Sequence, residues 1–146
     1  MKTVNIYTDG ACSGNPGDGG YCAILLYGGK EKVVSGFEAN TTNNRMELLA
    51  VIKGLEALKQ RCAVNLYSDS QYVVEAFNKG WLQGWINNGW KTANKKEVKN
   101  IDLWKRLTEL CSEHLVIFIK VAGHSDNEYN NRCDKIAVSE YKEKQQ

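Results

Sequence analysis

Val4-Asn5-Ile6-Tyr7-Thr8-Asp9-Gly10, near the start of this 146-residue chain, places Val4, Ile6 and Thr8 on one side and Asn5 and Tyr7 on the other. A period of two is typical of a β-strand, and an Asp-Gly pair is typical of the turn that follows one. We therefore predict that the chain begins with a strand that stops at Asp9-Gly10.

Glycine and proline divide the next part of the chain. Residues 12–20 contain four glycines and the only proline, which predicts a loop. Two strand-like runs follow at residues 21–27 and 32–37, and Gly28-Gly29 lies between them. This arrangement is typical of a hairpin, so we expect these two strands to be antiparallel.

A helical period begins at about Asn44. Its apolar stripe consists of Leu48, Val51, Ile52, Leu55 and Leu58. Residues 62–67 are predicted to form the next strand, and a strand that follows a crossover helix lies parallel to the strand before it. Later patterns predict helices at 71–78, 81–87 and 100–112, a strand at 115–121, and a last helix from about 127. Hairpin and crossover together predict an α/β fold, with helices packed on one mixed sheet.

Composition limits the kinds of protein that this chain can be. A length of 146 residues with 42% hydrophobic side chains suits a single domain over 1–146. The formal net charge is +2, yet residues 79–106 contain seven cationic and two acidic side chains. We therefore expect a local cationic surface for phosphates and, elsewhere, an anionic pocket for a metal.

The five cysteines give no sign of a disulfide framework or a structural zinc site. Their number is odd and no two are spaced Cys-x-x-Cys, so we expect reduced thiols and a cytoplasmic location. There is no signal-peptide pattern and no apolar run long enough to cross a bilayer. We expect a monomer that has no membrane partner.

One short stretch of sequence occurs twice in similar form, and this echo gives the first indication of function. Ile6-Tyr7-Thr8-Asp9 resembles Leu66-Tyr67-Ser68-Asp69, so two predicted strands each end on an aspartate. Adjacent parallel strands are about 4.8 Å apart, and ligands gather at the carboxyl ends of such strands. Asp9 and Asp69 could therefore share a metal ion. The alternative is that each aspartate caps a turn or the next helix.

Two further acids could join them. Glu47 is at the edge of the helical stripe, although Asn44-Arg45-Met46-Glu47 also resembles a capping box. On the last helix Ala137, Val138 and Tyr141 follow Asp134 at helical spacing, which predicts an inward-facing carboxylate. The alternative for Asp134 is an ion pair. Four oxygen ligands without cysteine or histidine favour Mg²⁺, or Mn²⁺, over Zn²⁺.

The chain has two histidines. His124 belongs to a predicted loop between the last strand and the last helix, where an imidazole could relay protons near neutral pH. The alternative is a solvent-exposed loop residue. His114 precedes a strand, and we interpret it as an ordinary residue at a helix end.

At this point several runs, in order along nearly the whole chain, resemble the type 1 ribonuclease H family. They are Tyr7 to Gly17, Thr41 to Leu48, Ser68 to Val73, Gly89 to Thr92, Asn100 to Trp104 and Asn130 to Asp134. The resemblance implies a ribonuclease H-like fold with a five-stranded mixed sheet and helices on both faces. It implies an endonuclease that hydrolyses the RNA strand of RNA–DNA hybrids and leaves 5′-phosphate and 3′-hydroxyl ends.

The resemblance also implies roles for single residues. Asp9, Glu47, Asp69 and Asp134 would hold two metal ions when substrate is bound, and His124 would aid proton transfer or product release. The minor groove of the hybrid would be gripped by Cys12, Asn15, Asn43, Asn44 and Gln71. Amide side chains can bind 2′-hydroxyls without reading base identity. Thr42 and Asn100 would form a pocket for a DNA-strand phosphate. The alternative for each asparagine is turn chemistry.

Residues 79–99 resemble the basic protrusion of the family. Its expected substrate-facing residues are Trp81, Trp85, Lys91, Lys95, Lys96 and Lys99. We expect most of the tryptophan surface to pack internally and the lysines to meet phosphates. One departure is Ile86-Asn87-Asn88, which has no cation where bacterial relatives often carry several.

Two other kinds of protein remain as alternatives. Another nuclease of the same fold would share the carboxylates, but the protrusion and the glycine-rich run at 10–17 favour ribonuclease H. A catalytically inactive hybrid-binding module would be free to lose its acids, and all four are present.

Overall fold

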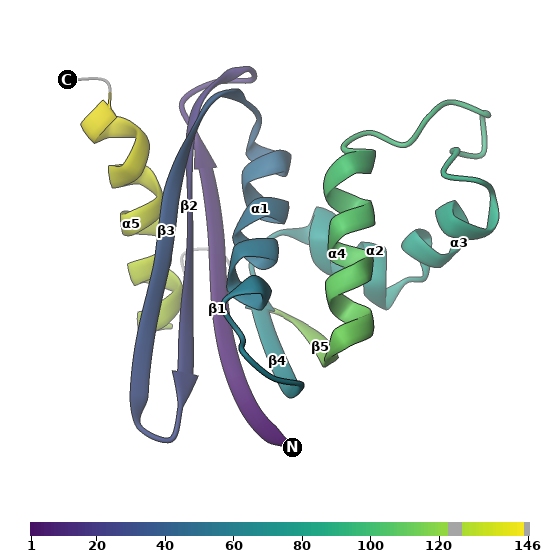
Figure 1. Ribbon diagram of the computed structural model, residues 1–146. Helices are drawn as coiled ribbons and strands as arrows, with labels where there is room; N and C mark the ends of the chain where they lie inside the picture. Colours follow the sequence, from purple (N-terminus) through teal and green to yellow (C-terminus); the bar gives the residue numbers. More distant parts are fainter. Residues whose placement is uncertain (123–126, 145–146) are drawn as a thin grey trace.

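The computed structural model describes residues 1–122 and 127–144 (Figure 1). Its strands are β1 (Lys2–Cys12), β2 (Gly17–Tyr27), β3 (Lys30–Thr41), β4 (Cys62–Ser68) and β5 (Leu115–Lys120). Its helices are α1 (Asn43–Glu56), α2 (Gln71–Asn78), α3 (Trp81–Asn87), α4 (Ile101–Glu113) and α5 (Glu128–Lys144).

All the strands just named join one mixed sheet in the order β3-β2-β1-β4-β5. The pairs β1–β2 and β2–β3 are antiparallel, whereas β1–β4 and β4–β5 are parallel. The predicted hairpin and the predicted crossover are therefore both confirmed. The two central strands, β1 and β4, run in the same direction, so their carboxyl ends meet at one edge of the sheet.

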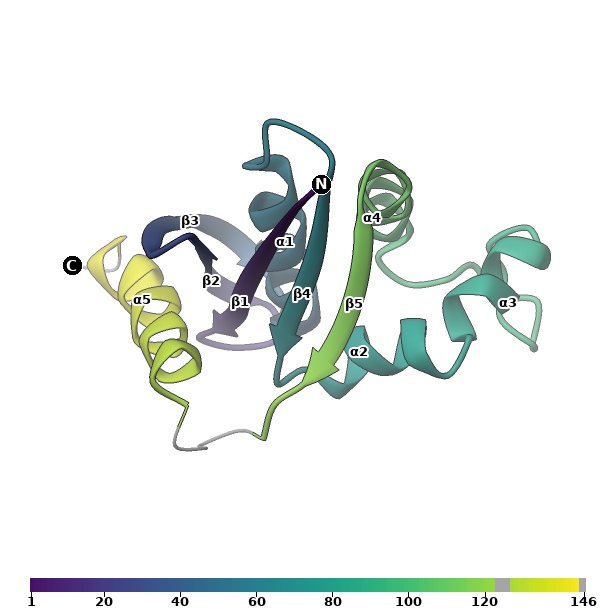
Figure 2. The same cartoon turned by 90° about the horizontal axis from the view of Figure 1, so that it is seen from below.

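Helices cover both faces of this sheet, as expected. Alternate residues of β2 point to opposite sides: Ala23 and Leu25 pack with the core under α1, whereas Cys22 and Ile24 pack against α5. Figure 2 shows α5 on one side of the sheet and α1 and α4 on the other. The fully buried Trp104 of α4 is part of the core on the α1 side.

The glycine-rich loop is shorter than we predicted. β1 continues to Cys12 and β2 begins at Gly17, so Gly19 and Gly20 pair with β1 in the sheet. The physical reason is close packing, because a Cβ on Gly20 would overlap the carbonyl oxygen of Ala137 in α5. Gly20 thus allows α5 to approach the strand, and Gly19 leaves room for Thr41 and Met46, whereas the sequence pattern suggests turns.

Residues 79–99 lie at the end of the molecule far from α5. α3 extends away from the sheet, and the backbone beyond it turns back towards α4 (Figure 2). Gly89, Trp90, Lys95 and Asn100 have positive φ in this return, and Lys91 pairs with Glu97 in a short antiparallel bridge. In the described ranges, no helix is long and apolar enough to cross a membrane.

Candidate functional site

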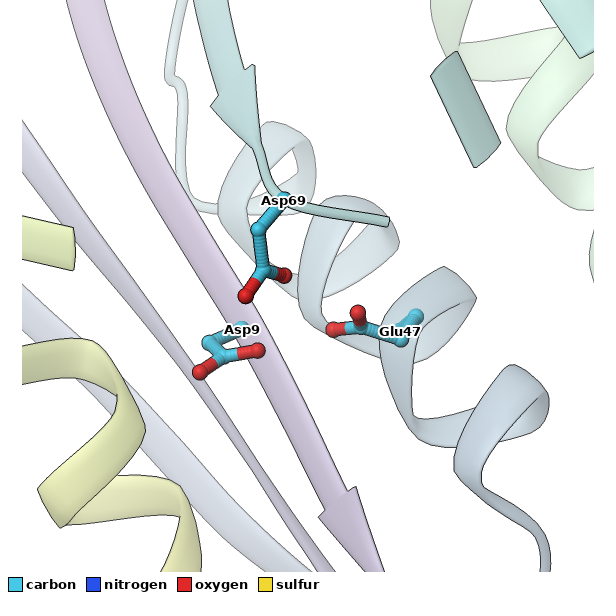
Figure 3. A group of neighbouring side chains, drawn as sticks. All are labelled: Asp9, Glu47 and Asp69. Atoms are coloured by element: carbon cyan, nitrogen blue, oxygen red, sulfur yellow. The ribbon is translucent and has the colours of Figure 1, made fainter. Parts of the chain in front are cut away.

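Three carboxylates come together at the edge of the sheet where β1 and β4 end. Asp9 belongs to β1, Asp69 directly follows β4, and Glu47 extends from α1 (Figure 3). One oxygen from each of the three lies within 4.8 Å of the other two. Parallel pairing of Thr8 with Ser68 brings the two aspartates side by side, as the echo predicted.

Glu47 reaches this cluster because α1 lies directly against β1. A Cβ on Gly10 would overlap the backbone at Met46 and Glu47, so only glycine fits there. The Gly10 N–H donates to Glu47 Oε1 at 2.5 Å and to Asp9 Oδ1 at 2.9 Å. The Glu47 side chain is thus buried and fixed beside Asp9.

The capping-box alternative for Glu47 is wrong. Thr42 is the N-cap of α1, and its Oγ1 accepts a hydrogen bond from the Arg45 N–H at 3.2 Å. Glu47 therefore lies beyond the first turn of the helix, where its carboxylate faces β1 and cannot reach the cap. The capping alternative for Asp69 also fails at α2, because the N-cap there is Ser70, which accepts from the Val73 N–H.

The cluster is unfavourable as a set of bare anions. Burial, followed by the charges of Asp69 and Asp134, raises the pKa of Asp9 from 3.8 to about 8. Burial and the neighbouring Asp9 carboxylate raise the pKa of Glu47 well above its ordinary value. Buried like charges suppress one another's ionisation, and a bound cation would remove that penalty.

Asp134 reaches the same place but not from the inward face that we predicted. The four acids line one hollow of about 240 Å³ together with Gly10, Ala11, Asn43, Asn130 and Asn131. The buried residues of α5 are Asn130, Cys133 and Ala137, whereas Asp134 is exposed at the rim. Cys133 packs on the sheet, and the next residue of a helix points about 100° away from it. The neighbouring Arg132, one candidate for an ion pair with Asp134, is paired with Glu31 instead, at 2.5 Å.

Asn130 is a site residue that our reading of the sequence missed. It is only 3% exposed, and its Oδ1 has no hydrogen-bond partner among the described residues. A buried acceptor without a hydrogen bond lowers the free energy of unfolding by roughly 1–3 kcal/mol unless a water or an ion binds it. The available signal was its spacing, because Asn130 precedes Asp134 by four residues on the same helix.

Of the two histidines, only His114 lies in the part of the chain that the structure describes. His124 is in the segment 123–126, outside the described residues, so its predicted role stays a prediction. His114 is buried at the end of α4, where its Nδ1 accepts the Cys62 N–H at 3.1 Å. This contact ties α4 to the start of β4 and confirms a structural role.

The residues predicted to grip the minor groove border the carboxylates. Asn15 Oδ1 accepts the Asn43 N–H at 3.1 Å, which joins the β1–β2 loop to the start of α1. The Cys12 thiol donates to the Gly14 and Thr41 carbonyls. Asn43 and Asn44 are exposed, and Gln71 is exposed on α2 with its amide on Glu75. The Asn15 side chain therefore makes a tertiary contact rather than the local hydrogen bond of a turn. Asn43 also lines the hollow.

Thr42 and Asn100 are brought together from distant parts of the chain. Arg45 connects them, since its N–H donates to Thr42 Oγ1 and its Nη1 donates to Asn100 Oδ1 at 3.4 Å. Arg45 also forms a bidentate pair with Asp102, at 2.9 and 3.0 Å. Arg45 therefore links Thr42 and Asn100, which are the N-cap residues of α1 and α4.

The protrusion presents its cations to solvent. Lys91, Lys95, Lys96 and Lys99 are all exposed, and none forms an ion pair within residues 1–122 and 127–144. Trp85 packs edge-on against the buried Trp104, with ring centroids 5.4 Å apart, as expected for internal packing. Trp81 differs, because 42% of it is exposed beside Lys79.

Comparisons with known proteins point to one family. The family model described as RNase H matches residues 1–142. The Ribonuclease H of Acetivibrio thermocellus is 63% identical over 142 residues, which is 97% of each chain. That of Chlorobaculum parvum is 61% identical with the same coverage.

Solved structures agree with this assignment. LC9-RNase H1, described as a type 1 RNase H with the type 2 active-site motif, is 27% identical with a TM-score of 0.88. The alignment covers 98% of this chain and 74% of that one. LC11-RNase H1, solved in complex with an RNA/DNA hybrid, has a TM-score of 0.74 and 22% identity. Its alignment covers 98% of this chain and 99% of that one, and it supports the fold alone.

Proposed function

The chain belongs to the ribonuclease H family and hydrolyses the RNA strand of RNA–DNA hybrids, and we propose that Asp9, Glu47, Asp69 and Asp134 hold the metal ions for this reaction. The observation that carries the proposal is the meeting of three carboxylates within 4.8 Å at the ends of parallel strands. Loss of cleavage when one of them is neutralised, as in Asp9→Asn, tests it.

The donor set fits a hard divalent cation. The hollow offers carboxylate oxygens from four acids, and the orphaned Oδ1 of Asn130 adds a buried acceptor for an ion or its water. Oxygen-only ligands favour Mg²⁺, with Mn²⁺ as the alternative. The raised pKa values of Asp9 and Glu47 support the same conclusion, because these acids ionise readily only when a cation is near.

When bound, two such ions would supply charge neutralisation and an activated water for hydrolysis of a phosphodiester. The protein's part is to hold its acids in place. Gly10 fixes Glu47 beside Asp9 through its N–H, and the sheet fixes Asp69 beside Asp9. Asp134 approaches from α5 at the exposed rim, where it can meet substrate and solvent. Hydrolysis would leave a 5′-phosphate and a 3′-hydroxyl.

The surface around the hollow suits a hybrid duplex. Asn43 and Asn44 face solvent beside the acids, and with Cys12, Asn15 and Gln71 they would grip 2′-hydroxyls in the minor groove. Thr42 and Asn100 would take a DNA-strand phosphate. The protrusion would contact the duplex beyond this surface, through Trp81, Trp85 and the four lysines. This division leaves the acids for chemistry and the amides for recognition.

Replacing His124 tests its role as a proton relay. His124→Ala is expected to slow turnover by roughly 10²-fold, because a general acid–base group contributes about that much at the low end. Mg²⁺ binding, measured by calorimetry, should be unchanged. His114→Ala is a poor control because His114 is buried, so the native protein over pH 6 to 9 serves instead. A variant whose kcat matches the native value throughout that range would remove His124 from the mechanism.

Salt dependence tests the protrusion. With three or four phosphate contacts from Lys91, Lys95, Lys96 and Lys99, log affinity should fall against log salt with a slope near −3. Asn87 and Asn88 are exposed, whereas Ile86 packs on the core. Lysine at 87 and 88 should therefore steepen the slope towards about −5, at about −0.9 per contact. KM should fall and kcat should stay the same, because these contacts bind ground and transition states alike.

The control is lysine at Gln60 and Ser112, both exposed and both far from the ends of β1 and β4 at Asp9 and Asp69. These changes add the same charge and should leave the slope within experimental error of the native slope. Equal slopes for the 87/88 variant and the native protein would mean that this segment does not approach the phosphates.

A further inference from the structure

Both the oxygen and the nitrogen of the Asn100 side-chain amide form hydrogen bonds. Asn100 has a φ of +60° just before α4, and its side chain makes no capping hydrogen bond to that helix. Its Oδ1 accepts from Arg45 Nη1 at 3.4 Å, and its Nδ2 donates to the Tyr72 hydroxyl oxygen at 3.1 Å. The amide therefore links α1 to α2, which lie close together with α4 on one side of the sheet (Figures 1 and 2).

The two partners of Asn100 are themselves anchored. The Tyr72 oxygen also accepts from Trp104 Nε1 at 2.9 Å, and the Trp104 ring is fully buried, with its centroid 5.4 Å from that of Tyr72. On the other side, both terminal nitrogens of Arg45 bind the Asp102 carboxylate. The amide thus lies between a phenol anchored in the core and a guanidinium held by a carboxylate.

This arrangement selects one orientation of the amide. A guanidinium can only donate, so the amide oxygen must face Arg45 and the amide nitrogen must face Tyr72. Trp104 can also only donate, which makes the Tyr72 oxygen an acceptor on that side and leaves it able to accept from Asn100. A phosphate is an acceptor, and an amide nitrogen carries two hydrogens. With one hydrogen on Tyr72, the second remains for a ligand.

We propose that Tyr72 is a positioning residue, whose hydroxyl orients the Asn100 amide so that it presents an N–H to a phosphate of the DNA strand. The inference rests on the proposed function, since it assumes that Thr42 and Asn100 take that phosphate. Thr42 is joined to the same scaffold through the Arg45 backbone. Without the phenol oxygen, the amide nitrogen loses its fixed acceptor and the N–H is no longer held towards the ligand.

Tyr72→Phe is the direct variant, because it keeps the ring against Trp104 and removes only the oxygen. KM for a hybrid duplex should rise about fivefold, the effect of one net hydrogen bond. The kcat should stay within about twofold of the native value, because binding of a remote phosphate is uniform between ground and transition states. Tyr27→Phe makes the same chemical change at the exposed end of the β2 hairpin and should alter neither constant.

A modified substrate separates positioning from a general loss of packing. The DNA strand of a short hybrid carries a single methylphosphonate, moved one position at a time relative to the cut. In the native enzyme, one position should raise KM about tenfold, as expected when a charged hydrogen bond is lost. In Tyr72→Phe the same substitution should raise KM only about twofold, while the other positions behave as in the native enzyme.

Asn100→Ala separates a failure of the Tyr72 inference from a failure of the phosphate pocket. If Asn100→Ala raises KM and Tyr72→Phe does not, the pocket exists and the inference about Tyr72 is overturned. If Asn100→Ala also leaves KM unchanged, the phosphate pocket itself is wrong and the inference falls with it. If Tyr72→Phe raises KM but keeps the full tenfold sensitivity to the methylphosphonate, the phenol acts elsewhere, and the inference is again overturned. Circular dichroism melting of each variant confirms that the folded enzyme is compared.

Discussion

Asp9→Asn should cleave a hybrid at least about 10³-fold more slowly than the native protein in Mg²⁺, since a metal's charge stabilisation is worth several kcal/mol. Asp9 is the acid that adjoins all the others. It lies beside Asp69, which directly follows β4, it shares the Gly10 N–H with Glu47, and the charge of Asp134 affects it. An amide in its place keeps the shape and the Gly10 hydrogen bond but removes the charge that a cation needs. Initial rates on a labelled hybrid measure the effect.

The same variant should be more stable than the native protein when metal is absent. The folded-state pKa of Asp9 is raised from 3.8 to about 8, so the folded protein holds this proton more tightly than the unfolded chain does. The free energy of unfolding of the metal-free native protein should therefore fall as pH rises from about 4 to about 8. Glu47 contributes in the same direction. At pH 8, Asp9→Asn should unfold at least about 3 °C higher, corresponding to about 1 kcal/mol of relieved repulsion.

Glu109→Gln is the matched control, because it neutralises an exposed acid of α4 outside the cluster. It should change neither the cleavage rate nor the pH dependence of the melting temperature. Near-normal cleavage by Asp9→Asn in Mg²⁺ would contradict the assignment of Asp9 as a metal ligand.

Gly10→Ala should damage both stability and activity, although it adds a single methyl group. That methyl would overlap the backbone of α1 at Met46 and Glu47, which cannot move as a flexible side chain can. Overpacking of this kind costs about 3 kcal/mol at the upper end. If α1 shifts to make room, Glu47 moves away from Asp9, and misplacement by about 1 Å can cost roughly 10²-fold in rate. Denaturant unfolding and kcat measure the two effects.

Gly84→Ala provides a matched comparison, because a Cβ there meets no atom within 4 Å. Alanine also has the higher helix propensity, so this change in α3 should be neutral or slightly stabilising. Native stability and native kcat in Gly10→Ala would show that α1 is not held against β1 as the structure indicates.

The sequence predicts the parts of the site that depend on strand order. The echo between Ile6-Tyr7-Thr8-Asp9 and Leu66-Tyr67-Ser68-Asp69 predicts two aspartates side by side, because a crossover helix makes the two strands parallel. The position of Glu47 on the edge of the apolar stripe also indicates that its side chain faces the sheet. These inferences use only periodicity and the handedness of connections, which local sequence carries.

Other parts depend on tertiary packing and could not be predicted in this way. Val138 and Tyr141 predict a stripe that places Asp134 on the inward face of α5, whereas packing against β2 buries Cys133 and Ala137. Local sequence predicts a loop at Gly19 and Gly20, because glycine is typical of turns. Gly20 is required because α5 packs against it, and Gly19 is required because Thr41 and Met46 do. No local pattern reveals either contact.

The contacts of Arg45 are a further feature that local sequence does not predict. Its neighbours in sequence indicate only the start of a helix, yet its side chain binds Asn100 and Asp102 more than fifty residues away. The link between Thr42 and Asn100 is therefore visible only in the structure, although the family resemblance had already assigned both to one pocket.

The most direct test of the central claim is a cleavage assay with three labelled duplexes: an RNA–DNA hybrid, double-stranded RNA and double-stranded DNA, each with and without Mg²⁺. We expect cleavage of the RNA strand of the hybrid alone, only when Mg²⁺ is present, with products that carry 5′-phosphate and 3′-hydroxyl ends. Equal cleavage of the hybrid after complete removal of divalent metal would contradict a metal centre formed by Asp9, Glu47, Asp69 and Asp134.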